Sequence, residues 1–110
     1  MGRMQRNKGK RGELEFSKEL TWTFDCTACR GRQYHGRQDA PDVYTDIEGI
    51  HFEVKRTESL SLYAAMDQAI EDAGDSIPVV AHRRNHKEWL VVVQLKDLPE
   101  FLRRVKEHLE

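Results

Sequence analysis

Residues 41–56 read PDVYTDIEGIHFEVKR, and this stretch decides the fold. Its two runs, residues 42–45 and 50–56, mix β-branched and aromatic residues with polar ones, as half-buried strands do. The residues between them, 46–49, include Asp and Gly and are typical of a turn. The stretch therefore predicts two strands joined by a tight connection.

The second run has two faces of different chemistry. Alternate residues of a strand share a face, so Glu53 and Lys55 point one way, and Phe52 and Val54 point the other way into the core. A Glu-x-Lys pair is common by chance, and a solvated strand face explains it as well as a catalytic one. The pair needs support from other parts of the chain.

Asp42 supplies the first support. If the connection is centred between residues 47 and 48, Asp42 lies opposite Glu53. Like charges that face each other across a sheet are unfavourable. A divalent cation between them reverses the sign of that interaction, and Mg²⁺ prefers oxygen ligands. The hairpin therefore predicts a cation site.

Outward from the hairpin, apolar periodicity predicts three helices and two more strands. They are a helix over residues 10–24, a helix from Ser59 or Ser61 to Gly74, strands over residues 77–82 and 89–95, and a last helix capped by Asp97. The run WLVVV is apolar on both faces, which predicts a strand inside the sheet. The order is α-β-β-α-β-β-α, and we expect one mixed sheet flanked by helices.

The expected helices carry apolar stripes that should form the core. These are Tyr63, Met66, Ile70 and Ala73 in the second helix and Leu98, Leu102, Val105 and Leu109 in the last. Trp22 and Trp89 are expected in the core as well.

The first helix presents one carboxylate on its apolar face. Glu13 is spaced i, i+3 and i+7 with Phe16 and Leu20, whereas Glu15 and Glu19 lie on roughly the opposite face, as solvated charges should. An inward carboxylate is costly unless something pairs with it. The alternative is an acid that only complements the start of the helix.

The bulk composition limits the class of protein. The chain has 110 residues, with 38% hydrophobic and 34% charged residues, which suits one soluble domain. We expect no membrane segment or secretory signal, a cytoplasmic location, and reduced thiols at Cys26 and Cys29. One CxxC pair is too few ligands for a zinc site.

The charge is unevenly distributed along the chain. Net charge is −1, but residues 1–37 carry a net +5 and residues 38–76 a net −8. A basic front and an acidic middle suit a protein that grips phosphates and holds a cation. Chance clustering on a solvated surface is the alternative.

Taken together, these residues resemble the signature of the PD-(D/E)XK nuclease superfamily. Pro41-Asp42 followed by Glu53-Val54-Lys55 fits that signature. Within the superfamily, the chain looks most like the small Holliday-junction-resolvase-like endonucleases of archaea and phages. Their first helix has a Lys-Gly pair with a Glu four residues after the Gly, and Lys8-Gly9 followed by Glu13 is similar.

Two further segments are similar to the same nucleases. An Arg/Gly-rich loop, CRGRQYHGRQDAPDV over residues 29–43, stands between the first helix and the hairpin. Gln68 in YAAMDQAIEDA looks like a glutamine that some relatives carry after the Glu-x-Lys strand. The resemblance covers about residues 8–95.

The resemblance implies a fold and an activity. The fold is α/β, a restriction-endonuclease-like mixed β-sheet flanked by helices, with residues 1–9 as a basic tail and residues 10–110 as one nuclease domain. The implied activity is Mg²⁺-dependent hydrolysis of DNA phosphodiester bonds, with Mn²⁺ as a substitute. The expected substrate is branched or duplex DNA, selected by structure more than by sequence.

The resemblance also implies the site. The catalytic residues would be Glu13, Asp42, Glu53, Lys55 and Gln68. The metal would be held by Asp42, Glu53, the Val54 carbonyl and Glu13. Lys55 would orient the nucleophile and offset charge on phosphorus, and Gln68 would position a water molecule or the scissile phosphate.

Basic residues would hold the DNA backbone. They are Lys8, Lys10, Arg11, Arg30, Arg32 and Arg37. We expect a homodimer, because a four-way junction has approximate two-fold symmetry, and an origin in a phage or its host. The alternatives are a nicking or restriction-like repair nuclease, a non-catalytic nucleic-acid-binding module with the nuclease fold, and an interaction protein of a replication complex.

Overall fold

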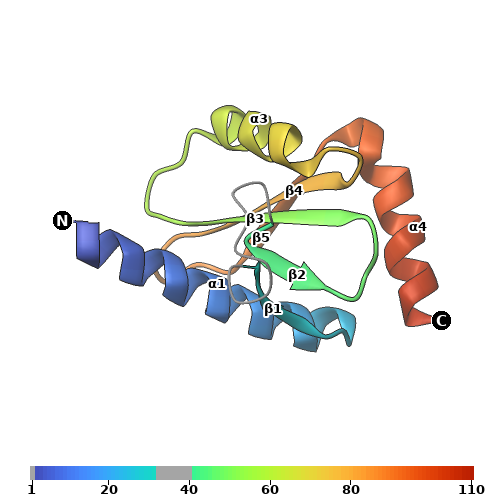
Figure 1. Cartoon of the computed structure of the whole chain (residues 1–110), viewed down its shortest axis with the longest axis horizontal. Coiled ribbons are helices and arrows are strands. Elements are labelled where there is room, and N and C mark those ends of the chain that lie inside the picture. Colours follow the sequence, from blue (N-terminus) through green and yellow to red (C-terminus); the bar gives the residue numbers. More distant parts are fainter. Residues whose placement is uncertain (1, 32–40) are drawn as a thin grey trace.

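The computed structural model describes residues 2–31 and 41–110 of the chain, with side chains from residue 9 onward. The elements are α1 (Gly2–Phe24), β1 (Ala28–Arg30), β2 (Val43–Thr45), β3 (Ile50–Arg56), α3 (Leu62–Ala73), β4 (Ile77–Arg83), β5 (Leu90–Val93), a turn of 3-10 helix, η1 (Leu95–Asp97), and α4 (Leu98–Leu109). Figure 1 shows them arranged around one sheet. In the described part of the chain, no helix has the length and apolar character needed to cross a membrane.

The sheet is mixed, as the sequence predicts. Its five strands follow the order β1-β2-β3-β4-β5. β3 and β4 are parallel, and every other neighbouring pair is antiparallel. A parallel pair needs a crossover, and α3 supplies it between β3 and β4. Figure 1 shows α1 and α3 on opposite sides of the sheet, with α4 at one end.

The hairpin of β2 and β3 has the predicted register. Val43 pairs with Phe52, which places Asp42 beside Glu53. β3 has the predicted bounds, and the turn before it includes Gly49 with φ +80°. A β-branched or bulky residue would be strained at that angle, which explains the glycine.

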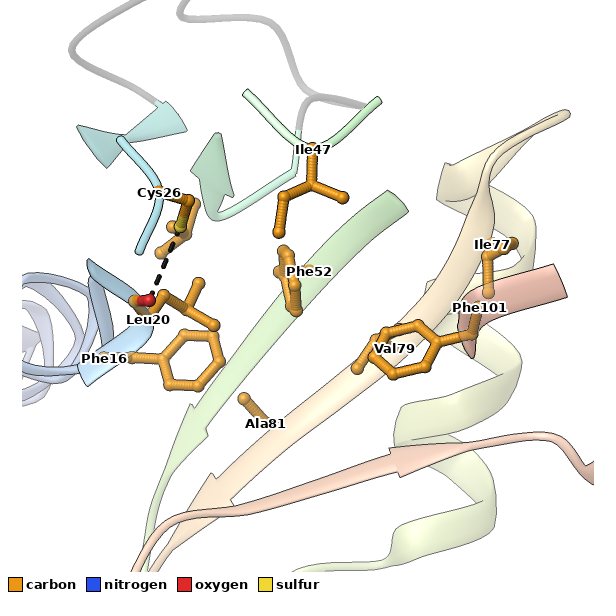
Figure 2. Packing of buried hydrophobic residues seen from close by; sticks show 10 residues of the cluster. Phe16, Leu20, Cys26, Ile47, Phe52, Ile77, Val79, Ala81 and Phe101 are labelled. Carbon is orange, nitrogen blue, oxygen red and sulfur yellow. Dashed lines mark hydrogen bonds between the residues drawn. The ribbon is translucent and has the colours of Figure 1, made fainter. Parts of the chain in front are cut away.

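The main core lies on the α1 side of the sheet (Figure 2). It comprises Phe16, Leu20, Cys26, Val43, Ile47, Phe52, Ile77, Val79, Ala81 and Phe101. The rings of Phe16 and Phe52 meet edge to face, with centroids 5.6 Å apart, and tie α1 to β3. Since Phe52 points to this side, its neighbours His51 and Glu53 point to the α3 side.

Gly12 lets α1 approach β3 closely. A Cβ on Gly12 would lie 2.6 Å from the Cβ of Arg56 and 3.8 Å from Cγ1 of Val54. The first distance is too short for two carbon atoms, so a larger residue would push the helix away from the strand. The glycine therefore sets the position of the next residue, Glu13.

The first helix differs from its prediction in where it begins and in the burial of Trp22. It begins at Gly2 instead of residue 10, so the helix includes residues expected to precede it. The early residues, rich in Arg, Met, Gln and Lys, are good helix formers. Trp22, expected in the core, is 85% exposed, whereas Trp89 is half-buried against Phe16 as predicted.

Strand β1 was not predicted. Its three residues lack any alternation of burial, and its pairing with β2 supplies the hydrogen bonds that make it a strand. Within residues 2–31 and 41–110, the observed order is α-β-β-β-α-β-β-α, with η1 before the last helix.

Strand β5 lies at the edge of the sheet, so the prediction of a buried inner strand is wrong. Leu90 is 60% exposed and Val91 is 45% exposed. A run of apolar residues predicts a strand with two apolar faces, but it does not predict whether other strands pair with it on one edge or on both. That depends on the order in which strands add to the sheet.

The stripe predicted for α3 is shifted. Met66 is buried as expected, but Tyr63 is 85% exposed and Ile70 is 39% exposed. The small residues Ala65 and Ala69 face the sheet instead. Small side chains let the helix lie close to β4, and this outweighs the larger apolar area of the expected stripe.

The stripe predicted for α4 is wrong in half its members. Leu98 and Val105 pack against the core, but Leu102 and Leu109 are each 56% exposed. Phe101 is the buried residue of this helix. A ring of that size fixes which side of the helix faces the sheet.

Candidate active site

Asp42 stands directly before β2, and backbone contacts hold it on both sides. Its N–H donates to the Phe52 carbonyl, and its Oδ2 accepts from the Val54 N–H, both at 2.8 Å. Its carbonyl accepts from the Gly31 N–H at 2.8 Å. A Cβ on Gly31 would lie 1.8 Å from the Pro41 carbonyl oxygen, so only glycine allows this approach.

Glu53 is buried in the middle strand of the sheet. Its carboxylate side chain is 8% exposed, and its Oε1 lies 2.8 Å from Nε2 of His51. Its negative charge also acts on Asp42 and raises the pKa of that carboxyl group. Lys55, two residues later on the same strand face, is half-buried.

The pKa of Asp42 reports its interaction with two other carboxylates. Burial, the negative charge of Glu53 and that of Glu13 raise the pKa of Asp42 to about 7, against the lowering effect of the Val54 N–H. Without a cation, a proton on Asp42 offsets the mutual repulsion. Glu13 and Glu53 therefore both act on Asp42, and we call these three residues the acidic unit.

Glu13 reaches this unit from α1 and, within the described part of the chain, pairs with Arg30. Its Oε1 accepts a hydrogen bond of 2.8 Å from Nε of Arg30, and both side chains are mostly buried. Arg30 was predicted to hold DNA phosphates, but here it pairs with a carboxylate.

Glu15 differs from its prediction. It was expected to be a solvated charge, yet it forms an ion pair with Arg83, lies 3.6 Å from Nε of Arg56, and accepts a 3.1 Å hydrogen bond from the indole of Trp89. Glu19 is exposed as expected. Glu15 therefore links α1 to β3 and β4, while Glu13 faces the acidic unit.

Gln68 reaches the site only indirectly. It is exposed on α3, and its amide lies 3.1 Å from both carboxylate oxygens of Asp72. A carboxylate oxygen of Asp72 lies within 4.8 Å of a ring nitrogen of His51 and of an oxygen of Glu53. Among the described residues, this contact joins α3 to the acidic unit.

Neither His51 nor Asp72 was among the residues predicted for the site. His51 shares the strand face of Glu53, and that spacing was the available signal. No sequence signal points to Asp72, because its position depends on how α3 docks against the sheet.

The predicted DNA-binding residues are only partly described. Lys10 and Arg11 are exposed on α1. Arg32, Arg37 and the side chain of Lys8 lie outside the described residues.

The cysteines are free, as predicted. Cys26 is buried, and this burial raises the pKa of its thiol, which donates a 3.5 Å hydrogen bond to the Leu20 carbonyl (Figure 2).

No known family model matches this chain, and no curated protein matches it. A solved structure does match, that of Hjc, a Holliday junction resolvase from the archaeal hyperthermophile Archaeoglobus fulgidus. The two chains are 21% identical, the TM-score is 0.56, and the match covers 78% of this chain and 72% of the other. The chain has a resolvase-like nuclease fold. In this fold, Asp42 directly precedes β2, Glu53 lies in β3 and Glu13 lies in α1.

Proposed function

We propose that the chain is a divalent-metal-dependent DNA endonuclease that selects branched DNA. The observation that carries this proposal is the position of Asp42, where its burial and the charges of Glu53 and Glu13 raise its pKa to about 7. Buried carboxylates that repel one another are costly unless a cation or a proton offsets their charge. The resolvase-like nuclease fold supports the same proposal, because it is the fold of a known nuclease.

The donor set fits Mg²⁺, with Mn²⁺ as a substitute. Carboxylate oxygens are the ligands that hard cations take. The Val54 N–H points at Asp42, and the carbonyl of a strand residue lies on the same edge as its N–H, so the Val54 carbonyl is the fourth candidate ligand. A bound divalent ion supplies Lewis acidity toward a phosphoryl oxygen and lowers the pKa of its bound water.

The chain's own residues hold the substrate around that site. Lys55 is a compact positive charge on the strand face of Glu53, and it would orient the attacking water and offset charge on phosphorus. Glu13 would accept a hydrogen bond from water at the site. Gln68, through Asp72, would support the site from α3.

DNA binding would depend on the basic residues of α1 and of the following loop. Lys8, Lys10, Arg11, Arg32 and Arg37 would contact backbone phosphates, and Arg30 would join them if DNA draws it away from Glu13. Such contacts read shape and charge, not base sequence. A homodimer would match the approximate two-fold symmetry of a four-way junction, the kind of DNA after which the matched resolvase is named.

A cleavage assay tests the proposal. The purified protein is incubated with labelled four-way junction, flap and duplex DNA, with Mg²⁺ or with EDTA, beside Lys55→Ala. Lys106→Ala, an exposed lysine of α4, is the matched control. We expect cleavage of the junction that requires metal, is lost in Lys55→Ala and is kept in Lys106→Ala.

Other outcomes select the alternatives. Binding without cleavage in any metal would indicate a non-catalytic nucleic-acid-binding module. Equal cleavage of junction and duplex would indicate a nicking or restriction-like repair nuclease. If the protein neither binds nor cleaves DNA, an interaction protein is the better description.

A further inference from the structure

We propose that His51 is a positioning residue that holds the Glu53 carboxylate in place for the cation. The proposal rests on the proposed function, because it assumes that Glu53 is a metal ligand. His51 shares its strand face with Glu53, and a residue in such a position is often half-exposed. His51 is in fact 4% exposed.

The contact between the two side chains is direct and sheltered. Nε2 of His51 lies 2.8 Å from Oε1 of Glu53, and the two side chains are 5% and 8% exposed. A hydrogen bond shielded from water in this way limits the rotation of a carboxylate far more than a solvated one does. It occupies Oε1 and leaves Oε2 available as a ligand.

Residues of α3 support His51 in turn. An oxygen of Asp72 lies within 4.8 Å of a His51 ring nitrogen, and Gln68 holds both Asp72 oxygens. The negative charge of a carboxylate at this distance favours a ring whose N–H is directed toward it. The series from Gln68 through Asp72 and His51 to Glu53 therefore joins the docking of α3 to the geometry of the cation site.

The test measures metal affinity without DNA. Mn²⁺ binding is followed by electron paramagnetic resonance of the free ion in wild type, His51→Phe and His51→Gln. We expect about 10- to 100-fold weaker binding for His51→Phe, the effect usual for such supporting residues. His51→Gln should recover part of the affinity, because its amide N–H can donate to Oε1.

Two control variants separate positioning from stability. His82→Phe removes a half-buried strand histidine whose ring contacts the Thr57 carbonyl at 2.9 Å, so it should lower the melting temperature and leave Mn²⁺ affinity unchanged. Asp72→Asn should weaken Mn²⁺ binding by a few-fold, while Asp67→Asn, on the exposed side of the same helix, should not. The asparagine pair tests the series even if His51→Phe does not fold.

A spectroscopic measurement distinguishes positioning from direct ligation. The electron spin echo of bound Mn²⁺ is modulated by a nitrogen that coordinates the metal. We expect no such nitrogen modulation in the wild type. Its presence would make His51 a ligand and would overturn the proposal.

The remaining outcomes are also decisive. If wild type binds Mn²⁺ and cleaves DNA but both His51 variants bind Mn²⁺ as tightly as wild type, only the role of His51 falls. If wild type binds no Mn²⁺ and cleaves nothing, the proposed function falls and this inference falls with it.

Discussion

Glu13 and Glu15 lie two residues apart on α1 and have opposite surroundings. Glu15 contacts two arginines and an indole N–H, so its charge is compensated by the protein. Among the residues that the structure describes, Glu13 pairs with Arg30, and its charge acts on Asp42 together with that of Glu53. Glu15 belongs to an ion-pair cluster that joins α1 to β3 and β4, whereas Glu13 belongs to a group of carboxylates that raises the pKa of Asp42. The raised pKa, not the mere presence of acids, distinguishes the candidate site.

The electrostatic repulsion is unfavourable around Asp42 but not around Glu15. Around Glu15 the charges nearly balance, so the cluster needs nothing from solution. Around Asp42, burial and two carboxylates raise the pKa to about 7, so a proton compensates when no cation is present. Proteins retain such unfavourable arrangements at sites where a ligand relieves them.

Of the substitutions proposed, Asp42→Asn in the acidic unit should have the largest effect on cleavage. It removes a proposed metal ligand, and metal assistance contributes several kcal/mol, so cleavage should fall by at least about a hundredfold. DNA binding should be kept or tightened, because a charge that repels phosphate is gone. Cleavage and gel-shift assays on one junction measure both. Loss of binding together with cleavage would indicate misfolding instead.

Gly12→Ala should disturb both clusters by moving the helix. The added Cβ would lie 2.6 Å from the Cβ of Arg56, so α1 must shift and carry Glu13 with it. A shift of about 1 Å can cost about 100-fold in rate, and the protein should also melt at a lower temperature.

Gly9→Ala is the matched control for this variant. A Cβ on Gly9 meets no atom within 4 Å, so the change should stabilise the helix by about 0.5–1 kcal/mol and keep activity. Equal behaviour of the two alanine variants would contradict the close approach of α1 to β3.

The stability of the metal-free protein should fall as pH rises from about 4 to about 7. The folded state keeps a proton on Asp42 that the unfolded chain has already released at its ordinary pKa of 3.8. The loss amounts to at most about 4 kcal/mol, at 1.36 kcal/mol per unit of pKa.

Urea denaturation in EDTA at pH 4.5 and 7.5 measures this loss, with Asp42→Asn as the reference. The variant should lack this part of the pH dependence. If the two proteins have the same dependence, Asp42 has no raised pKa.

Glu15→Gln and Glu13→Gln should have the smallest effects, and they test whether the two glutamates have different roles. Glu15→Gln should lower stability by about 1–2 kcal/mol, because a partly exposed pair with arginines contributes modestly, and should leave Mg²⁺ affinity intact. Glu13→Gln should weaken Mg²⁺ binding and change stability less. Thermal melts and calorimetric titrations of both variants check this, and an exchange of the two results would reverse the assignment.

The hairpin was predictable because its information is local. The alternation in β3 and the turn before it gave the bounds of the strand and the pairing of Val43 with Phe52. Strand β1 and the edge position of β5 were not predictable in the same way. Each depends on which strand lies beside it, and a three-residue strand such as β1 has no period of its own.

The residues of the candidate site also divide into those that local sequence patterns predict and those that depend on long-range contacts. Asp42 and Glu53 follow from register, and Glu13 from helical spacing. The partners of Glu15 and the place of Asp72 depend on contacts between elements far apart in the chain, so the sequence pattern contained no signal for them. The burial of His51 likewise follows from the packing of α3.

Proton release on metal binding tests the central claim most directly, namely that Glu13, Asp42 and Glu53 form one cation site. Mg²⁺ is titrated calorimetrically into the protein in two buffers of different ionisation enthalpy, at pH 6 and at pH 8.5. We predict close to one proton released per site at pH 6, close to none at pH 8.5, and none from Asp42→Asn at either pH. Mg²⁺ binding at pH 6 without proton release, or no Mg²⁺ binding at all, would contradict the account.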